Sequence, residues 1–267
     1  PVFATGAGVG GRGAIVNNGP NSQQNSLRLV TLNGPTTIGG TNRWDIRANP
    51  TTTTNGQLST GGNGYKLTKV GPNQISLVGV LVDPALGDIE VQNGIFSVET
   101  VTSSLGNPAN TLTLWTNASL QFFQVSNVFT KSIIMSNGSF IVYNNGTNTY
   151  RGTVVLQGSN TFNVGGVWLR LTNVVSGSGT LSKIGGNVLW VLGTGRRLYY
   201  YAHLQGLAPW VLMGRRVHAG QVIGDVGNTG NAAATIPHLH FCIYLVTNDF
   251  YPFRLGPMDP YAVLKRE

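Results

Sequence analysis

The sequence predicts an all-β fold, with a β-solenoid over residues 1–185 and a small β-sheet segment over residues 186–267. Three observations support this prediction. Charged residues make up only 10% of the 267 residues and glycine occurs 37 times, which is typical of strands joined by frequent turns and unlike a helical bundle. Short apolar runs alternate with polar residues and are separated by Asn-Gly and Gly-Ser turns. One of these runs also recurs later in the chain.

Alternating apolar residues define the predicted strands of residues 1–185. In "TLTLWTNASLQFF", Leu112 and Leu114 are followed by Ala118, Leu120 and Phe122. Residues two apart on a strand point to the same side, so each set is expected to face a core. No stretch carries a 3.6-residue period, and long helices are therefore not expected.

The recurrence joins "YKLTKVGPNQISLVG" (65–79) to "GTLSKIGGNVLWVLG" (179–193). Its glycines allow tight corners, and its alternating apolar positions are expected to face inward. Stacked units of this kind form a solenoid, in which each turn of the chain covers the next. The positions that share one offset are Leu67/Leu181, Lys69/Lys183, Gly71/Gly185, Asn73/Asn187, Leu77/Val191 and Gly79/Gly193.

Four stretches carry a family likeness: "LTKVGPNQISLVG", "GDIEVQNGIFSVE", "GSNTFNVGG" and "VVSGSGTLSKIGG". They resemble the autotransporter-associated β-strand repeat of bacterial surface proteins. The resemblance covers residues 5–190 and implies a right-handed parallel β-solenoid (β-helix) in an exported passenger region. It also implies a location outside the cell, at the bacterial surface or in the periplasm.

The character of the chain changes near residue 186, where aromatic and arginine residues become frequent. Three of the four histidines lie in "YYYAHL" (199–204) and "PHLHF" (237–241). His238 and His240 are two apart on a predicted strand and should point to one face. Two imidazoles placed in this way can share a metal ion, or one can bind it while the other takes part in catalysis.

Together with "GQVIGDVGNTGNA" and "MDPYAVL", these motifs resemble the C-terminal part of the lysostaphin/LytM-type zinc endopeptidases, which cut peptide bonds in peptidoglycan. The likeness runs from Gly185 to Leu264. It implies a zinc cofactor with His240 as a metal ligand. It also implies that His203 and His238 are catalytic residues that orient a zinc-bound water and stabilise the oxyanion.

The chain departs from that family in its metal ligands. The family takes two ligands from an upstream H-x-x-x-D, whereas no histidine precedes His203 here. A catalytic zinc normally needs three protein ligands, and only His240 has a match. The sequence therefore predicts a truncated, inactive peptidase-like segment without zinc, and a zinc enzyme only if other groups complete the site.

Cys242 is the single cysteine, so the chain forms no internal disulfide. It stands where the family usually has a glutamate. We expect a buried, inert thiol on the face opposite to His240, which would exclude it as a replacement ligand. His218 matches no family role and is expected to lie in a solvated turn. The histidines of the motifs also have a structural interpretation, as a hydrogen-bonded core residue (His203) and as remnants on a strand (His238 and His240).

The net charge is +8, but the positive charges are sparse, with no Lys/Arg run longer than two. This distribution argues against nucleic-acid binding and is compatible with an anionic envelope polymer such as peptidoglycan. No apolar run approaches the ~20 residues of a membrane span.

Three functions remain open. The first is a secreted or cell-surface structural β-solenoid with the peptidase-like segment as a C-terminal cap. A solenoid ends in open strand edges, so such a protein could also associate head to tail into fibres. The second is a zinc endopeptidase that acts on peptidoglycan cross-link peptides. The third is a module that binds cell-wall peptide or glycan without cleaving it.

Overall fold

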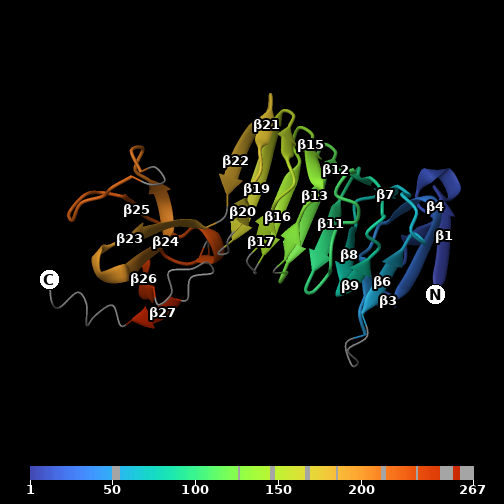
Figure 1. Ribbon diagram of the computed structural model, residues 1–267, viewed down its shortest axis with the longest axis horizontal. Helices are drawn as coiled ribbons and strands as arrows, with labels where there is room; N and C mark the ends of the chain where they lie inside the picture. Colours follow the sequence, from blue (N-terminus) through green and yellow to red (C-terminus); the bar gives the residue numbers. More distant parts are fainter. Residues whose placement is uncertain are drawn as a thin grey trace. The chain divides into compact units, whose positions relative to one another are not determined.

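The computed structural model describes residues 1–49, 55–125, 127–144, 148–165, 169–184, 186–211, 215–232, 234–246 and 255–258. The chain divides into two compact units, Pro1–Lys183 and Ile184–Glu267. The regular structure of the described residues consists of β-strands and three short 3-10 turns, which confirms the all-β fold (Figure 1). None of the described segments is a helix with the length and apolar character needed to cross a membrane.

The first unit is a parallel β-solenoid whose strands stack in successive coils (Figure 1). Its elements are β1 (Val2–Gly6), η1 (Val9–Gly11), β2 (Ile15–Asn17), β3 (Gln23–Leu27), β4 (Leu29–Gly40), β5 (Trp44–Arg47), β6 (Gly56–Ser59), β7 (Leu67–Lys69), β8 (Gln74–Val78), β9 (Val80–Val82), β10 (Ile89–Val91), β11 (Ile95–Glu99), β12 (Thr111–Leu114), β13 (Ser119–Phe123), β14 (Val128–Phe129), β15 (Ser132–Met135), β16 (Phe140–Asn144), β17 (Asn148–Tyr150), β18 (Val154–Leu156), β19 (Ser159–Gly165), β20 (Leu169–Leu171), β21 (Val175–Gly177) and β22 (Thr180–Ile184).

The later coils have three faces and a constant length. On the first face Leu112 pairs with Ile133, Ile133 with Val154, and Val154 with Val175, a step of 21 residues each time. The second face (β13, β16, β19) and the third face (β14, β17, β20) advance by the same step. Because these later coils share one length, equivalent side chains lie directly above one another along this part of the stack.

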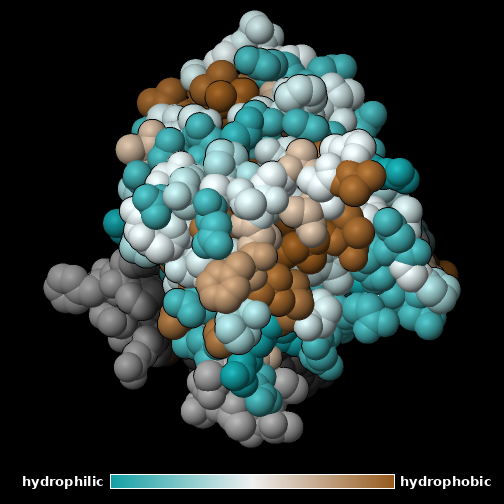
Figure 2. All heavy atoms as spheres, turned by 90° about the vertical axis from the view of Figure 1, so that its right-hand side faces the viewer, coloured by the Kyte–Doolittle hydropathy of each residue, from teal (hydrophilic) through white to brown (hydrophobic). Residues whose placement is uncertain are grey.

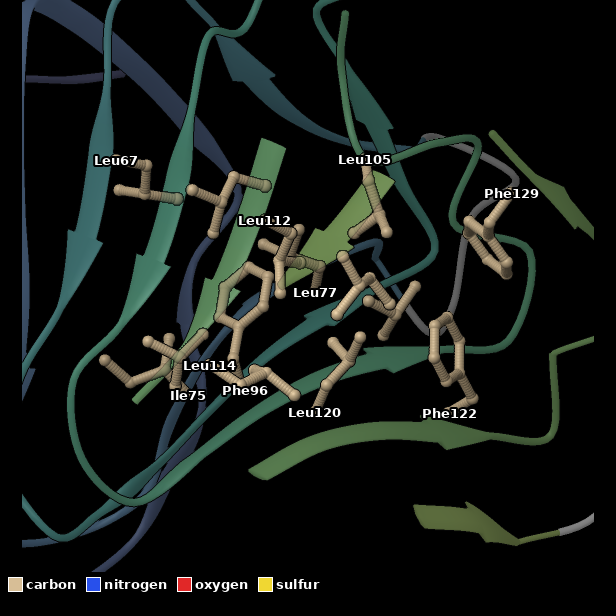
Figure 3. Packing of buried hydrophobic residues seen from close by; sticks show 14 of the residues in the cluster. Leu67, Ile75, Leu77, Phe96, Leu105, Leu112, Leu114, Leu120, Phe122 and Phe129 are labelled. Carbon is tan, nitrogen blue, oxygen red and sulfur yellow. The ribbon is translucent and has the colours of Figure 1, made fainter. Parts of the chain in front are cut away.

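The core runs through the interior of these coils. The five alternating residues of "TLTLWTNASLQFF", Leu112, Leu114, Ala118, Leu120 and Phe122, all have no exposed surface, which confirms the expectation from the pattern. Figure 3 shows how leucines from neighbouring strands point toward one another and toward the phenylalanine rings. Burial of these ladders stabilises the solenoid by the hydrophobic effect.

The long recurrence in the sequence is not the structural repeat. Leu67 lies on β7 in the first sheet, whereas its counterpart Leu181 lies on β22 in the second sheet. The second half of the later copy, from Asn187 on, belongs to β23 in the antiparallel sheet of the second unit. The match arises because strands on different faces share one inward-outward alternation. The corner glycines behave as expected, since Gly71 and Gly79 have φ angles of +80° and +64°.

Two inward lysines bind main-chain oxygens at corners of the solenoid. Lys69 Nζ donates to the carbonyls of Gly71, Asn73 and Asn93 at 2.5–2.8 Å and to Asn73 Oδ1 at 3.2 Å. Lys131 Nζ donates to the carbonyls of Gly87 and Asn107 at 2.7 and 2.8 Å. Burial lowers the pKa of Lys69 to about 7 and that of Lys131 to about 8. The oxygen acceptors oppose this effect by stabilising the ammonium form.

Asp83 ties two successive coils together. Its Oδ2 accepts hydrogen bonds from the backbone N–H groups of Thr60 and Gly62 at 2.8 and 3.1 Å, and its Oδ1 accepts one from Ala85 N–H at 3.0 Å. Burial alone would raise the pKa of Asp83, but these N–H groups lower it to about 2. The carboxylate form is therefore part of the folded structure.

We expect the stability of the solenoid to depend on Asp83 in acid. The pKa in the folded chain lies below the value of the unfolded chain, so Asp83 stabilises the fold above pH 4 and loses this contribution as the pH falls through about 2. The measurement is urea unfolding of the wild type and of Asp83→Asn from about pH 6 down to about pH 2, a range that includes the pKa values of the unfolded and the folded chain. The difference between the two proteins should shrink as the pH falls. A difference that stays constant would contradict the role of the carboxylate.

The second unit is a small antiparallel sheet. Its elements are β23 (Asn187–Leu192), η2 (Thr194–Arg196), β24 (Arg197–Leu207), β25 (Gly224–Val226), η3 (Gly230–Ala232), β26 (His240–Val246) and β27 (Leu255–Met258). The strand order is β23-β24-β26-β27, and β25 pairs with β24. Ala202, Leu204 and Ile243 are buried in this unit. The central strands β24 and β26 carry two of the three motif histidines, and the third precedes β26.

Candidate functional site

His203 reaches the site through an irregularity in β24. Ala202 pairs with His240, and opposite residues of antiparallel strands share a face. Strict alternation would therefore put His203 on the other face. Instead the pairing of β24 with β23 shifts register between Tyr201 and Leu204, its pairing with β25 shifts between Leu204 and Gly206, and His203 has a φ angle of +61°. Bulges re-aim side chains in this way, at the cost of a left-handed backbone conformation that is rare outside glycine.

The three motif histidines lie side by side. The ring centroids of His203 and His238 are 5.0 Å apart, and those of His203 and His240 are 5.7 Å apart. His203 is half-buried, whereas His238 and His240 are exposed. β26 begins at His240, so His238 lies just before the strand. His218 is an exposed turn residue whose N–H donates to Gln221 Oε1 at 3.0 Å.

Backbone carbonyls orient two of these rings. His203 Nδ1 lies 2.9 Å from the carbonyl oxygen of Thr229, and His238 Nδ1 lies 2.9 Å from that of Ile236. A carbonyl can only accept a hydrogen bond, so Nδ1 of each neutral ring carries the proton. The Nε2 atom of each ring then keeps a lone pair, which can accept a proton or bind a metal ion.

The structure corrects the expectation for Cys242. The side chain is partly exposed, and its Sγ lies 3.3 Å from His240 Nε2. The assignment to the opposite face was wrong because His240 and Cys242 are two residues apart on β26, and residues two apart on a strand share a face. Cys242 therefore belongs to the same cluster as the histidines.

Aromatic rings flank His240 and Cys242. Trp190 pairs with Tyr200 and Tyr200 pairs with Cys242, which places all three residues on one face. The ring centroid of Trp190 is 4.4 Å from that of Tyr200 and 5.6 Å from that of Tyr244. Burial, with Cys242 nearby, raises the pKa of Tyr200 and Tyr244, so both phenols stay protonated near neutral pH. We call Trp190, Tyr200 and Tyr244 the aromatic wall. Each lies on a different strand, so the sequence shows the three residues, but only the register of the strands brings their rings together.

The five carboxylates that precede the histidines in sequence are used within the solenoid. Asp45 and Glu99 accept from Arg43, Asp83 holds the corner described above, and the other two accept from neighbouring coils: Asp88 from Thr111 N–H, and Glu90 from Lys66 Nζ. Each carboxylate thus has partners within the first unit. The sequence alone did not show which task each carboxylate performs.

The family's zinc ligand set does not fit the residues present. One of its three positions, His240, has a match in the sequence. Among the side chains that the structure describes, no three His, Cys, Asp or Glu residues converge on one point as metal ligands. His240 and Cys242 lie in contact, but two side chains are too few for a catalytic zinc, so no catalytic step through a metal is derived from them.

Comparison with known proteins agrees with the sequence motifs. Residues 170–252 match the sequence model of peptidase family M23. The L-Ala--D-Glu endopeptidase of Bacillus subtilis (strain 168) is 35% identical over 68 residues, which are 24% of this chain and 21% of that protein. The chain thus spans about a fifth of the length of the curated relative it matches. No solved structure matches the chain. The comparisons thus show that residues 170–252 are similar in sequence to M23 peptidases, while the β-solenoid is a finding of the structure.

Proposed function

We propose that this chain is an exported structural β-solenoid, whose C-terminal unit keeps the frame of an M23-type peptidase without its activity. The supporting observation lies at the start of the family match. Residues 170–184 belong to the match, yet they form the solenoid strands β20, β21 and β22. A stretch that is built into a solenoid is not available to carry a peptidase metal-binding hairpin.

Self-association through the open end of the solenoid is part of this proposal. Among the described strands, β1 and β2 pair only with β4, and β3 pairs only with β5, so the first coil has free edges. Phe3 and Val9 are 64% and 87% exposed in this coil, and Figure 2, which views the molecule from this side, shows apolar patches among polar surface. Free parallel edges with apolar neighbours favour head-to-tail contacts, which do not close into a ring.

A second candidate is an endopeptidase that acts on peptidoglycan cross-link peptides. The observation that favours it is the cluster of His203, His238 and His240, with a free Nε2 lone pair on His203 and on His238. Zinc in such a site would lower the pKa of a bound water and make it a nucleophile near neutral pH. This candidate requires ligands beyond the single position that matches the family.

A third candidate is a binding module for wall peptides or glycans. The aromatic wall of Trp190, Tyr200 and Tyr244 lies beside exposed imidazoles, and the nearby Ile236 is 83% exposed. Aromatic faces with polar neighbours are common in recognition sites for peptides and sugars. Binding without cleavage would preserve this surface and dispense with the catalytic metal.

The test uses one preparation of the full chain and three measurements. We expect no release of peptide fragments from purified peptidoglycan, with or without added zinc, and a mean mass in sedimentation that rises with protein concentration. Cleavage that is lost in His240→Ala but kept in His218→Ala would overturn the structural proposal in favour of the peptidase. Co-sedimentation with peptidoglycan without cleavage, in a chain that stays monomeric, would favour the binding module instead.

A further inference from the structure

We propose that Asn93 is a site of spontaneous covalent modification, at which the side-chain amide is converted through a cyclic imide into aspartate and isoaspartate. Asn93 is exposed at the corner between β10 and β11, and Gly94 follows it. The reaction needs a nitrogen nucleophile close to the amide, stabilisation of that nucleophile and access for water. The proposal stands apart from the proposed function, because it involves neither cleavage nor self-association.

The nucleophile is the main-chain nitrogen of Gly94. Its N–H donates to Asn93 Oδ1 at 2.7 Å, so the side-chain amide already lies on the same side as the nitrogen that attacks it. The carbon Cγ is one C=O bond of about 1.23 Å from Oδ1, which puts it within about 3.9 Å of that nitrogen. A small rotation about Cα–Cβ brings Cγ to the distance of roughly 3–3.5 Å from which bonds form.

Glycine at position 94 leaves this nitrogen accessible. Gly94 has a φ angle of +67°, and an added Cβ would lie 2.5 Å from the Asn73 carbonyl oxygen and 2.6 Å from Lys69 Nζ. The corner therefore requires glycine. The same lack of a side chain removes the steric barrier to ring closure.

Two other asparagines have the same local contact but a different following residue. The N–H of the next residue lies 2.8 Å from the side-chain oxygen in both Asn127 and Asn173, and that next residue is a valine. A branched Cβ crowds the nitrogen and stiffens the chain beside it. Among these three asparagines the structure thus singles out Asn93.

Lys69 stabilises the reactive form of the nucleophile. The Gly94 nitrogen must lose its proton to attack, and peptide resonance shares the resulting negative charge with the carbonyl oxygen of Asn93. Lys69 Nζ donates to this oxygen at 2.8 Å. The carbonyls of Gly71 and Asn73, at 2.6 and 2.5 Å, hold the ammonium group in place. A donor is therefore already positioned at the atom where negative charge develops.

The reaction balances with water as the sole co-reactant. The Gly94 nitrogen forms a bond to Asn93 Cγ, the Cγ–Nδ2 bond breaks, and Nδ2 leaves as ammonia with the proton that the Gly94 nitrogen gave up. Water then adds to one of the two ring carbonyls and breaks its bond to the ring nitrogen. Addition at Cγ yields aspartate, and addition at the main-chain carbonyl carbon yields isoaspartate.

The products change the corner in two ways. Both place a new carboxylate near the ammonium group of Lys69. Isoaspartate also inserts one methylene into the main chain between β10 and β11, which are each held in register by neighbouring strands. The chain that carries isoaspartate should therefore unfold at lower urea concentration than the unmodified chain.

The pair Asn137–Gly138 is a matched control within the same chain. It is also an Asn-Gly corner with an exposed asparagine, but Gly138 N–H donates to the Ser159 carbonyl at 2.6 Å. Asn137 Oδ1 accepts from Ser159 N–H at 2.8 Å. The next coil thus holds both groups that would have to meet. We expect Asn93 to convert about 10-fold faster or more, since it alone has a preorganised donor on the developing charge.

Peptide mass spectrometry of the full chain, incubated at neutral pH and sampled over time, tests the proposal. It should detect amide-to-acid conversion with isoaspartate at Asn93, ahead of Asn137. In concentrated urea the two pairs should convert at similar rates, because neither set of contacts persists. Equal rates in the folded chain would overturn the proposal. A preference that persists unchanged in urea would also overturn it, since the local sequence and not the fold would then set the rate.

Two variants test the groups involved. Asn93→Gln should abolish conversion at this position, because the longer side chain would have to close a larger ring. Lys69→Met should slow conversion of Asn93 by about 10-fold, less than the loss of such a donor in a dry active site, and Lys66→Met should leave the rate unchanged. A folded Lys69→Met chain that converts at the wild-type rate would overturn the role of Lys69. If this variant does not fold, the comparison of folded and urea-unfolded wild type decides. None of these results bears on peptidoglycan cleavage or sedimentation, so failure of this proposal and failure of the proposed function are separate outcomes.

Discussion

Replacing Phe122 by alanine should lower the free energy of unfolding of the solenoid by about 3–5 kcal/mol. Phe122 has no exposed surface, and its ring contacts that of Phe129, with centroids 4.8 Å apart (Figure 3). The two rings join the second face of the solenoid to the third. Alanine would leave a cavity between rigid ladders, which can relax only partly because the neighbouring coils are held in register. The measurement is equilibrium unfolding in urea.

Phe123→Ala is the matched control for this prediction. Phe123 is the next residue of β13, points to the outer side of the sheet and is only partly buried. Its removal should cost well under half as much, since part of the ring is already in contact with water. Equal losses in the two variants would contradict the assignment of inward and outward positions on this strand.

Replacing Lys69 by methionine should cost about 3 kcal/mol or more. Methionine has nearly the same length but no donor, so the carbonyls of Gly71 and Asn93 and the side-chain oxygen of Asn73 would lose their ammonium partner. Buried acceptors without donors each cost about 1–3 kcal/mol. The apolar side chain offsets only part of this loss. Urea unfolding at neutral pH measures the effect.

The control for Lys69 is a lysine three residues earlier. Lys66 lies near the surface and forms an ion pair with Glu90 at 2.6 Å. Surface pairs of this kind contribute about 0–1 kcal/mol, so Lys66→Met should change stability by no more than that. If both variants lose the same amount, the carbonyl contacts of Lys69 do not carry the stability assigned to them.

Local patterns predicted the inward face of the solenoid correctly. Alternation along a strand depends only on backbone geometry, which is why Leu112, Leu120 and Phe122 could be assigned to the core from the sequence. The 21-residue coil escaped detection because its turns vary in composition while its strands share one general pattern. Lys69 was also missed as an inward residue, since a lysine enters a core only where the fold supplies acceptors.

The site shows a similar division. Motif spacing singled out His203, His238 and His240. In the structure the ring centroid of His203 lies 5.0 Å from that of His238 and 5.7 Å from that of His240. The bulge that turns His203 toward the other two is a register shift between strands, which no single strand's sequence reveals. The aromatic wall depends on register in the same way.

The sequence by itself determined the class of the fold, the apolar ladders and the likeness of the C-terminal segment to M23 peptidases. These follow from periodicity and short motifs, which are properties of neighbouring residues in the chain. Only the tertiary structure decided the coil length, the binding of main-chain oxygens by Lys69, and the register shifts in β24 that bring His203 to His240. Those features depend on which strands pair and in what register, because pairing brings together groups that lie far apart in the sequence.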